Sequence, residues 1–299
     1  MKKRILSIVI ISTLFLVGCN EEKLEQLKQK QLEQTTQFEQ KIQQLESQID
    51  LLEKEKAIKV QNEVMLFQRK DDTYPVEFSF ATLNTNKAWL NDLLITQMLM
   101  SNLNNKKRDN TLDSKTQLLQ ILTEKYEHEL NEAKDTFKDL PKEQISGTYF
   151  SADYYSSIDY VGQRENLATF VQNNFNYIGG AHGIHNVKYL NIDLNKKIIL
   201  SLDDLFTTEN QTKLKEMLWD RYEPQYRTAD GNMGFFFQNK QKLYLPKDFY
   251  FSALGINFVY PVYEIGSYAD GQKELTLSWS EINPLINQAF STRKALFSE

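Results

Sequence analysis

The distribution of hydrophobic residues divides the chain into three regions with different patterns. Residues 5–17 form an apolar run that is too short to cross a bilayer as a helix. Residues 20–62 are rich in Glu, Lys and Gln and contain neither Gly nor Pro. From about residue 63 onward, apolar residues alternate with polar ones or recur every three to four positions. The pattern therefore predicts a leader, a helical spacer and a folded head.

The spacer carries a short heptad pattern. Its apolar residues step by four, three, four and three positions: Phe38, Ile42, Leu45, Ile49 and Leu52. Upstream the seam positions become polar until Leu24 is in phase again. This pattern predicts a long helix that forms a weak coiled coil, about 60 Å long at about 1.5 Å per residue. A solvated, partly disordered tether is the alternative.

The first half of the head should combine one strand, two helices and a hairpin. The alternation in Val76–Thr82 predicts a strand, and Asn86 is the expected cap of a helix that runs to Met100. A second helix should begin at Ser114, with Gln117 completing a capping box, and stop before Pro141. Aromatic and polar residues then alternate in a predicted hairpin, 146–161 with 167–178. Its tyrosines Tyr149, Tyr155 and Tyr160 are expected in the sheet core, with stacking on sugar rings as the alternative.

The second half begins with small residues and continues mainly as strands. The small residues are Gly179, Gly180, Ala181 and Gly183. Strands are expected at 185–194, 198–200, 249–253, 256–260 and 274–279, and Thr208 should cap a helix after the acidic turn 201–206. The fold class is therefore α+β: a two-part head with mixed or antiparallel sheets and packed helices, preceded by a long N-terminal helix. The expected parts are a leader (1–18), a stalk (19–62) and two α+β subdomains (63–178 and 179–299).

Candidate chemistry gathers around the glycine-rich run. His182 and His185 suggest a metal pair, and the glycines suggest an anion cradle. A metal site needs three or four ligands, however, and a phosphate cradle needs a following helix, whereas a strand is expected here. We therefore expect mainly structural roles and predict no metal and no cofactor.

Four carboxylates are candidates for acid–base chemistry, together with His182: Asp203, Asp204, Glu264 and Asp270. The side chains of adjacent Asp203 and Asp204 should diverge in an extended segment, and Asp204 suits a helix N-terminus. No catalytic residue is predicted.

The leader has the features of an export signal. Lys2, Lys3 and Arg4 precede the apolar run, which ends in Leu16-Val17-Gly18-Cys19. This ending resembles the lipobox of bacterial lipoproteins, and the resemblance implies cleavage before Cys19 and a lipid on its sulfur. In a Gram-negative host, Asn20 after this cysteine favours an outer-membrane lipoprotein that faces the periplasm.

The charge balance is acidic. Removing the three positive charges of the leader from the net charge of −5 leaves −8. An acidic chain is a poor nucleic-acid binder and suits a basic partner.

Three motifs in the head follow one another in a recognisable order. They are Gly179-Gly180-Ala181-His182-Gly183, the turn Leu202–Phe206, and the segment Phe258–Gly271, which contains Tyr263, Glu264 and Tyr268. Over about residues 74–286 the chain resembles the extracytoplasmic domains of the RsiV and PdaC type, found in a lysozyme-sensing anti-sigma factor and a peptidoglycan deacetylase. The resemblance implies a partner near cell-wall glycan or lysozyme. A cytoplasmic sigma-binding segment and a deacetylase domain are not expected here.

Three functions remain open at this point. The first is a lipid-anchored, non-catalytic envelope protein that recognises a lysozyme-like enzyme or peptidoglycan. The second is a cell-wall glycan hydrolase that uses carboxylate and histidine chemistry. The third is an envelope assembly factor that forms homo-oligomers through the stalk.

Overall fold

The computed structural model describes residues 21–103, 106–145, 151–226 and 240–291. The chain divides after Glu55 into two units, an N-terminal unit and a head that comprises residues 56–299. The leader and the lipidation expected at Cys19 lie outside the described residues. Within the described residues, no helix combines the length and the apolarity that crossing a bilayer requires.

The N-terminal unit contains one long helix, α1 (Glu21–Lys56), of 36 residues. Its Glu, Gln, Lys and Leu residues are strong helix formers, and no Gly or Pro interrupts them. The predicted helix is therefore confirmed. The side chains of Phe38, Ile42 and Leu45 are 46–69% exposed, so the apolar seam has no partner within the described part of this chain.

The head contains a six-stranded sheet in which the strands follow chain order, β1-β2-β3-β4-β5-β6. Its strands are β1 (Val60–Lys70), β2 (Val76–Thr85), β3 (Ala152–Arg164), β4 (Leu167–Tyr177), β5 (Ile184–Asp193) and β6 (Ile198–Ile199). Neighbouring strands are antiparallel except β2 and β3, which are parallel. The sheet is therefore mixed, as expected.

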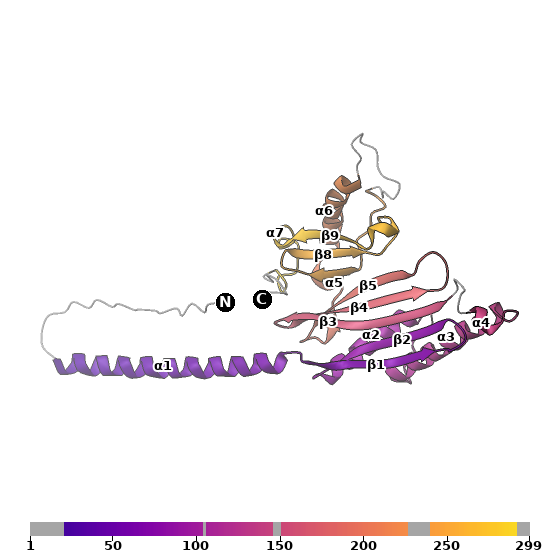
Figure 1. Cartoon of the computed structure of the whole chain (residues 1–299). Coiled ribbons are helices and arrows are strands. Elements are labelled where there is room, and N and C mark those ends of the chain that lie inside the picture. Colours follow the sequence, from indigo (N-terminus) through magenta and orange to yellow (C-terminus); the bar gives the residue numbers. More distant parts are fainter. Residues whose placement is uncertain (1–20, 104–105, 146–150, 227–239, 292–299) are drawn as a thin grey trace. The chain divides into compact units, whose positions relative to one another are not determined.

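Helices connect the two parallel strands, because a parallel pair needs a crossover and cannot be joined by a tight turn. The connection contains α2 (Ala88–Asn102), α3 (Ser114–Thr136) and α4 (Lys142–Ile145). Figure 1 shows α2 and α3 beside the sheet, and both helices contact β2. Leu90, Leu94 and Leu118 are fully buried in the core between them and the sheet.

A second, three-stranded antiparallel sheet follows, in the order β7-β8-β9. Its strands are β7 (Asp248–Phe251), β8 (Gly255–Tyr260) and β9 (Lys273–Ser278). The short helices α5 (Leu202–Leu205), α7 (Trp279–Ile282) and η1 (Tyr268–Asp270) and the longer α6 (Thr208–Tyr226) accompany it. Together they enclose a second core around Tyr222, Phe258 and Leu277.

Strand β5 links the two sheets within the head. The side-chain amide of Asn191 donates to the carbonyl of Phe249 at 2.6 Å, and the backbone N–H of Tyr189 donates to Asp248 at 2.9 Å. The ring of Tyr189 also stacks on Tyr250, with centroids 4.2 Å apart. The subdomain boundary expected after residue 178 falls inside the six-stranded sheet, because β5 pairs with β4 along its length.

Strand β1 is absent from the sequence-based expectations, which placed the stalk up to Asn62. The helix ends at Lys56 and β1 begins at Val60, so that boundary lies inside the strand. A register shift between Met65 and Phe67 explains the omission. Met65 is exposed and Phe67 is buried, so the shift breaks the two-residue alternation that marks a strand.

The first residue of α2 differs from the prediction. Lys87 occupies the N-cap position, one residue after the expected Asn86. The side chain of Asn86 instead accepts the backbone N–H of Lys59 at 2.9 Å and donates to the carbonyl of Ala57 at 3.1 Å. Asn86 therefore fixes the segment that leads into β1, a contact distant in sequence.

The caps of the next two helices also differ from the prediction. Asp113, and not Ser114, caps α3 by accepting the backbone N–H of Thr116 at 2.9 Å. In α6, Thr208 is already helical, and the hydroxyl of Thr207 accepts the N–H of Asn210 at 3.3 Å. Each cap therefore lies one residue before its predicted position, because the neighbouring Asp, Ser and Thr residues are all favourable helix caps.

Candidate functional site

The glycine-rich loop between β4 and β5 has a backbone that only glycine adopts easily. Gly179 and Gly180 have φ values of 88° and 98°. At Gly183 a Cβ atom would lie 2.3 Å from the ring of Phe175, so a side chain does not fit there. The hydroxyl of Tyr177 donates to the carbonyl of Gly180 at 2.8 Å and holds the turn. The small residues thus place His182 at the tip of a fixed loop.

The loop between β8 and β9 is also tightly constrained. Asp270 accepts the backbone N–H of Ser267 at 2.9 Å and its hydroxyl at 2.7 Å, which forms a capping box for η1. The Ser267 hydroxyl is the main cause that lowers the pKa of Asp270. Gly271 follows with a φ of 67°, and Tyr263 has a positive φ of 70°, which is rare for an aromatic residue. These constraints orient the ring of Tyr263.

The two loops meet through three aromatic side chains that lie far apart in the sequence. The imidazole of His182 stacks on Tyr268, with centroids 3.7 Å apart and an interplanar angle of 15°. The hydroxyl of Tyr263 lies 3.1 Å from Nε2 of His182, and the hydroxyl of Tyr268 donates to the carbonyl of Gly183 at 2.7 Å. The first and third sequence motifs therefore form one structural feature.

This feature exposes aromatic side chains, and the glycine-rich loop that carries His182 exposes an isoleucine at each end. Tyr263 is 50% exposed, and the ends of the glycine-rich loop expose Ile178 (59%) and Ile184 (44%). We call Ile178, His182, Ile184, Tyr263 and Tyr268 the loop patch. Large exposed apolar residues that gather in one place are typical of an interaction site, whereas single ones are common on any surface.

His185 does not join this feature. It lies on β5, and its ring packs against Phe175, with centroids 4.5 Å apart. The metal pair considered for His182 and His185 therefore has no structural support. Among the described residues, no group of three or more His, Cys, Asp or Glu side chains is arranged to hold a metal ion.

Asp203 and Asp204 lie in the first turn of α5 and accept hydrogen bonds there. Asp204 accepts the backbone N–H of Ser201 at 2.8 Å and its hydroxyl at 2.7 Å. The backbone hydrogen bond is the main cause that lowers the pKa of Asp204. Asp203 accepts a hydrogen bond from Gln211 at 2.7 Å. Both carboxylates thus stabilise local helical structure, and no hydrogen bond of the described residues joins either of them to His182.

Glu264 follows Tyr263 and is exposed at the edge of the loop patch. Burial, and then the charge of Glu264, raise the pKa of the Tyr244 hydroxyl to about 12. Of the motif residues, Tyr263 and Tyr268 contact His182, whereas Asp203 and Asp204 belong to a different contact.

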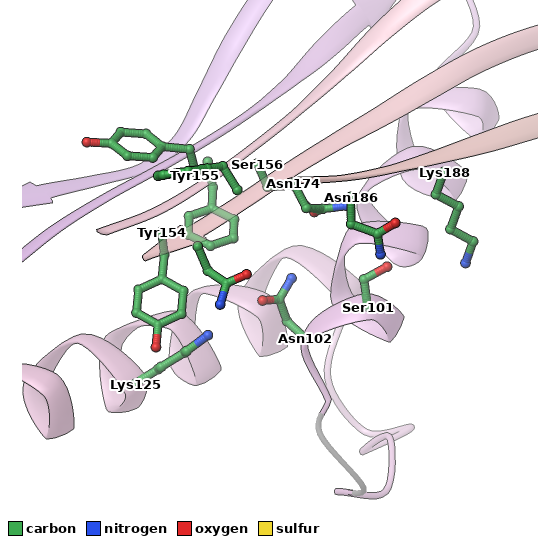
Figure 2. A pocket seen from close by; sticks show the side chains of 12 residues that line it. Ser101, Asn102, Lys125, Tyr154, Tyr155, Ser156, Asn174, Asn186 and Lys188 are labelled. Atoms are coloured by element: carbon green, nitrogen blue, oxygen red, sulfur yellow. The ribbon is translucent and has the colours of Figure 1, made fainter. Parts of the chain in front are cut away.

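A polar cleft that the sequence analysis did not identify lies between the helices and the six-stranded sheet (Figure 2). Its volume is about 410 Å³. The polar side chains that line it come from α2, α3 and β3–β5: Ser101, Asn102, Lys125, Tyr154, Ser156, Asn174, Asn176, Asn186 and Lys188. The signal in the sequence is a row of polar residues at alternate positions of β4 and β5, where apolar core residues would be expected.

Comparison with known proteins gives a family match for the C-terminal part only. Residues 203–280, which extend from α5 to α7, match a family model described as a protein of unknown function (DUF3298). No curated protein matches the chain. The matched region includes Asp203, Asp204, Tyr263, Glu264 and Tyr268. The glycine-rich loop lies outside it.

The solved structures that resemble the chain include the following two. A DUF3298 family member from Bacteroides fragilis has a TM-score of 0.52 and 22% identity, covering 77% of this chain and 93% of that one. A DUF3298 family protein from Pseudomonas aeruginosa has a TM-score of 0.47 and 15% identity, covering 77% and 94%. The first similarity supports the fold alone. The finer resemblance to the RsiV and PdaC type stays a prediction.

Proposed function

We propose that this chain is a non-catalytic binding protein of the bacterial cell envelope and that its loop patch docks a basic, lysozyme-like enzyme. The observation that carries the proposal is the convergence of two distant sequence motifs on an exposed aromatic surface. Aromatic residues held in a fixed orientation lose little conformational entropy on binding, which makes them effective anchors in protein interfaces.

The charge around the patch favours a basic partner. Glu264 and Asp270 are exposed on the same loop as Tyr263, and the chain from Cys19 onward carries a net charge of −8 once the three leader charges are removed from −5. Complementary charges at an interface accelerate association and select against acidic competitors. Lysozyme-like enzymes carry the opposite charge, which agrees with the partner that the family resemblance implies.

The chemistry of the patch supports binding more than catalysis. His182 lies against Tyr268 and beside the hydroxyl of Tyr263, and Asp270 is engaged by Ser267 and by Lys273. A general acid–base pair needs two titratable groups that face a common substrate position. The imidazole and the carboxylates of these motifs instead hold the loops in place.

The proposed position of the head depends on the leader and the stalk. A lipid on Cys19 would anchor the chain, and the long helix α1 would carry the head away from the membrane. Mass spectrometry of the native protein tests the anchor. We expect a chain that begins at a lipid-modified Cys19, and an unmodified cysteine preceded by residues 1–18 would overturn the proposed location.

Retention of the purified chain on immobilised lysozyme tests the function. We expect retention at low salt and release as ionic strength rises, because screening weakens attraction between exposed charges. Tyr263→Ala should reduce retention at least several-fold, whereas Leu254→Ala, which truncates a 74% exposed leucine outside the patch, should not.

Two other results would change the proposal. Binding of muropeptides without binding of lysozyme would make cell-wall glycan the ligand. If neither probe binds in calorimetry, the proposal of an envelope-binding head of this kind is wrong.

A further inference from the structure

The polar cleft between α2, α3 and β3–β5 is unusual because of its charge. The chain has 40 acidic and 35 basic residues, yet the described residues that line the cleft include two lysines and no carboxylate. In Figure 2, Lys125 lies at the Tyr154 end of the cleft and Lys188 at the Asn186 end. The cleft shares no residue with the loop patch.

Lys125 is held in place by an aromatic ring. Its ammonium lies 3.6 Å from the centroid of Tyr154, which is close for a cation–π contact. The hydroxyl of Tyr154 donates to Glu129 at 2.9 Å, so that carboxylate is engaged by the phenol. Burial lowers the pKa of Lys125, and the charge of Glu129 opposes this effect. Within the described residues, no carboxylate forms an ion pair with Lys125.

Lys188 provides the second positive charge, on β5. It lies opposite Gln172 of β4 in the sheet register and is exposed at the mouth of the cleft. The nearby Asp248 raises the pKa of Lys188, but desolvation by surrounding protein is larger and lowers it. Asp248 itself accepts the backbone N–H of Tyr189, and across the described part of the chain no ion pair involves Lys188.

The floor of the cleft is a row of amides and hydroxyls whose positions are fixed. Asn174 accepts hydrogen bonds from the Ser156 hydroxyl at 2.9 Å and from Gln172 at 3.1 Å. Gln172 also accepts from the Ser101 hydroxyl at 3.3 Å, which joins the sheet to α2. A network anchored in this way keeps polar groups oriented and reduces the entropy lost when a ligand binds.

We infer that this cleft binds a small acidic sugar, with the positive charges of Lys125 and Lys188 at its two ends favouring the carboxylate and the amide row hydrogen-bonding the hydroxyl groups. Amide side chains both donate and accept, as sugar hydroxyl groups do. A volume of about 410 Å³ lies in the range of small-ligand sites. This inference goes beyond the proposed docking of an enzyme and does not depend on it.

Saturation-transfer NMR and calorimetry on the purified full chain test the inference with three matched probes. They are D-glucuronate, D-glucose, which lacks only the carboxylate, and acetate, which lacks the hydroxyl groups. We expect D-glucuronate to bind more tightly than either of the others. Equal binding of D-glucose, or of acetate, would overturn the acidic-sugar assignment. Inorganic phosphate that binds more tightly than D-glucuronate would also overturn it.

Substitutions of residues that line the cleft test whether D-glucuronate binds there. Lys125→Gln and Lys188→Gln should each weaken D-glucuronate binding several-fold, because each removes one of the two positive charges that attract the carboxylate. Lys134→Gln removes the same charge from an exposed position of α3 outside the cleft and should bind like the original chain. Asn186→Ala should weaken D-glucose and D-glucuronate alike.

The unfolding temperature of each variant shows whether a loss of binding comes from the cleft or from misfolding. Lys188 and Asn186 are exposed, so their substitution should leave the unfolding temperature unchanged. If Lys188→Gln and Asn186→Ala are folded and bind D-glucuronate like the original chain, the cleft is not its site. Unaltered retention of these variants on lysozyme would show that the loop patch and the cleft act independently.

Discussion

The imidazole ring of His182 lies almost flat on the phenol ring of Tyr268, with centroids 3.7 Å apart and an interplanar angle of 15°. His182 belongs to the loop after β4, and Tyr268 to the loop after β8. The contact therefore fastens the three-stranded sheet to the end of the β4–β5 hairpin. Aromatic pairs of this kind contribute about 0.5–1.5 kcal/mol beyond the burial of their surface.

The hydroxyl of Tyr268 should contribute separately from its ring. Tyr268→Phe keeps the stack on His182 but removes the hydrogen bond to the carbonyl of Gly183. We expect the free energy of unfolding to fall by about 1 kcal/mol and amide exchange in the glycine-rich loop to accelerate. Urea unfolding and hydrogen-exchange mass spectrometry measure the two effects.

Tyr160→Phe is the matched control. Burial alone raises the pKa of Tyr160, and its hydroxyl has no hydrogen-bond partner among the described residues. We expect little change in unfolding or exchange. Equal effects of both substitutions would mean that the bond to Gly183 contributes nothing specific.

Gly255 should tolerate no side chain. A Cβ atom at this position would lie 1.9 Å from the backbone carbonyl oxygen of Leu277 on β9, which cannot move aside without breaking the β8–β9 pairing. We expect Gly255→Ala to lower the free energy of unfolding by about 3 kcal/mol or more, beyond the usual range for overpacking.

Gly180→Ala is the comparison for Gly255→Ala. No atom lies within 4 Å of a Cβ at Gly180, whose φ is +98°. Only backbone strain opposes the substitution, at roughly 1–2 kcal/mol. Thermal and urea unfolding should rank the two variants in this order, and the reverse ranking would contradict the close approach of β8 and β9.

The sequence predicted most elements of the fold but not the contacts that join them. Strong periodicity located α1, α3 and the hairpin of β3 and β4, because a local pattern determines which face is buried. The order of motifs indicated that the loops containing His182 and Tyr268 matter. Their contact depends on how β5 and β7 lie together, which no local pattern specifies.

Other features escaped the sequence analysis for physical reasons. The irregularity near Met65 hides β1, because it breaks the alternation of buried and exposed residues. The cleft forms where α2 ends and leaves polar positions of β4 and β5 uncovered, so Lys125 and Lys188 line one cleft only in three dimensions. Asp113 and Ser114 are both good helix caps, and composition alone does not choose between them.

Stability should depend on pH through Asp248, which lies where the two sheets meet. Burial is the main cause that raises the pKa of its carboxyl group from 3.8 to about 7. The folded state then binds a proton that the unfolded state releases, so this contribution favours folding at low pH. It is lost progressively as the pH rises from about 4 to about 7.

Asp248→Asn removes this titration while keeping an oxygen that can accept the N–H of Tyr189. The variant should be more stable than the original chain at pH 8, by roughly 1–2 kcal/mol because the site is only partly buried, and the difference should shrink towards pH 4. Urea unfolding at both pH values measures it. A difference that does not change with pH would contradict the raised pKa.

Asp270→Asn should change the free energy of unfolding in the opposite direction and therefore serves as the control. Hydrogen bonds from Ser267 lower the pKa of Asp270, so its contribution is present at neutral pH and is lost only as the pH falls below 3.8. This variant should be less stable than the original chain at neutral pH. Opposite shifts of the two variants would separate the buried carboxyl group from the helix-capping one.

The exposed seam of α1 predicts self-association through the stalk. Phe38, Ile42 and Leu45 follow the heptad spacing and are exposed in the single chain, so a second copy of the helix would bury them. Sedimentation equilibrium of the Cys19→Ser chain, which removes the expected lipid, should show a mass above that of the monomer at micromolar concentrations. Ile42→Lys should restore the monomer, whereas Gln40→Lys, on the opposite side of the helix, should not.

The truncated control must begin at Lys56, because removal up to Asn62 would delete the first residues of β1. A monomeric mass for both the full and the truncated chain would leave α1 as a tether without a partner.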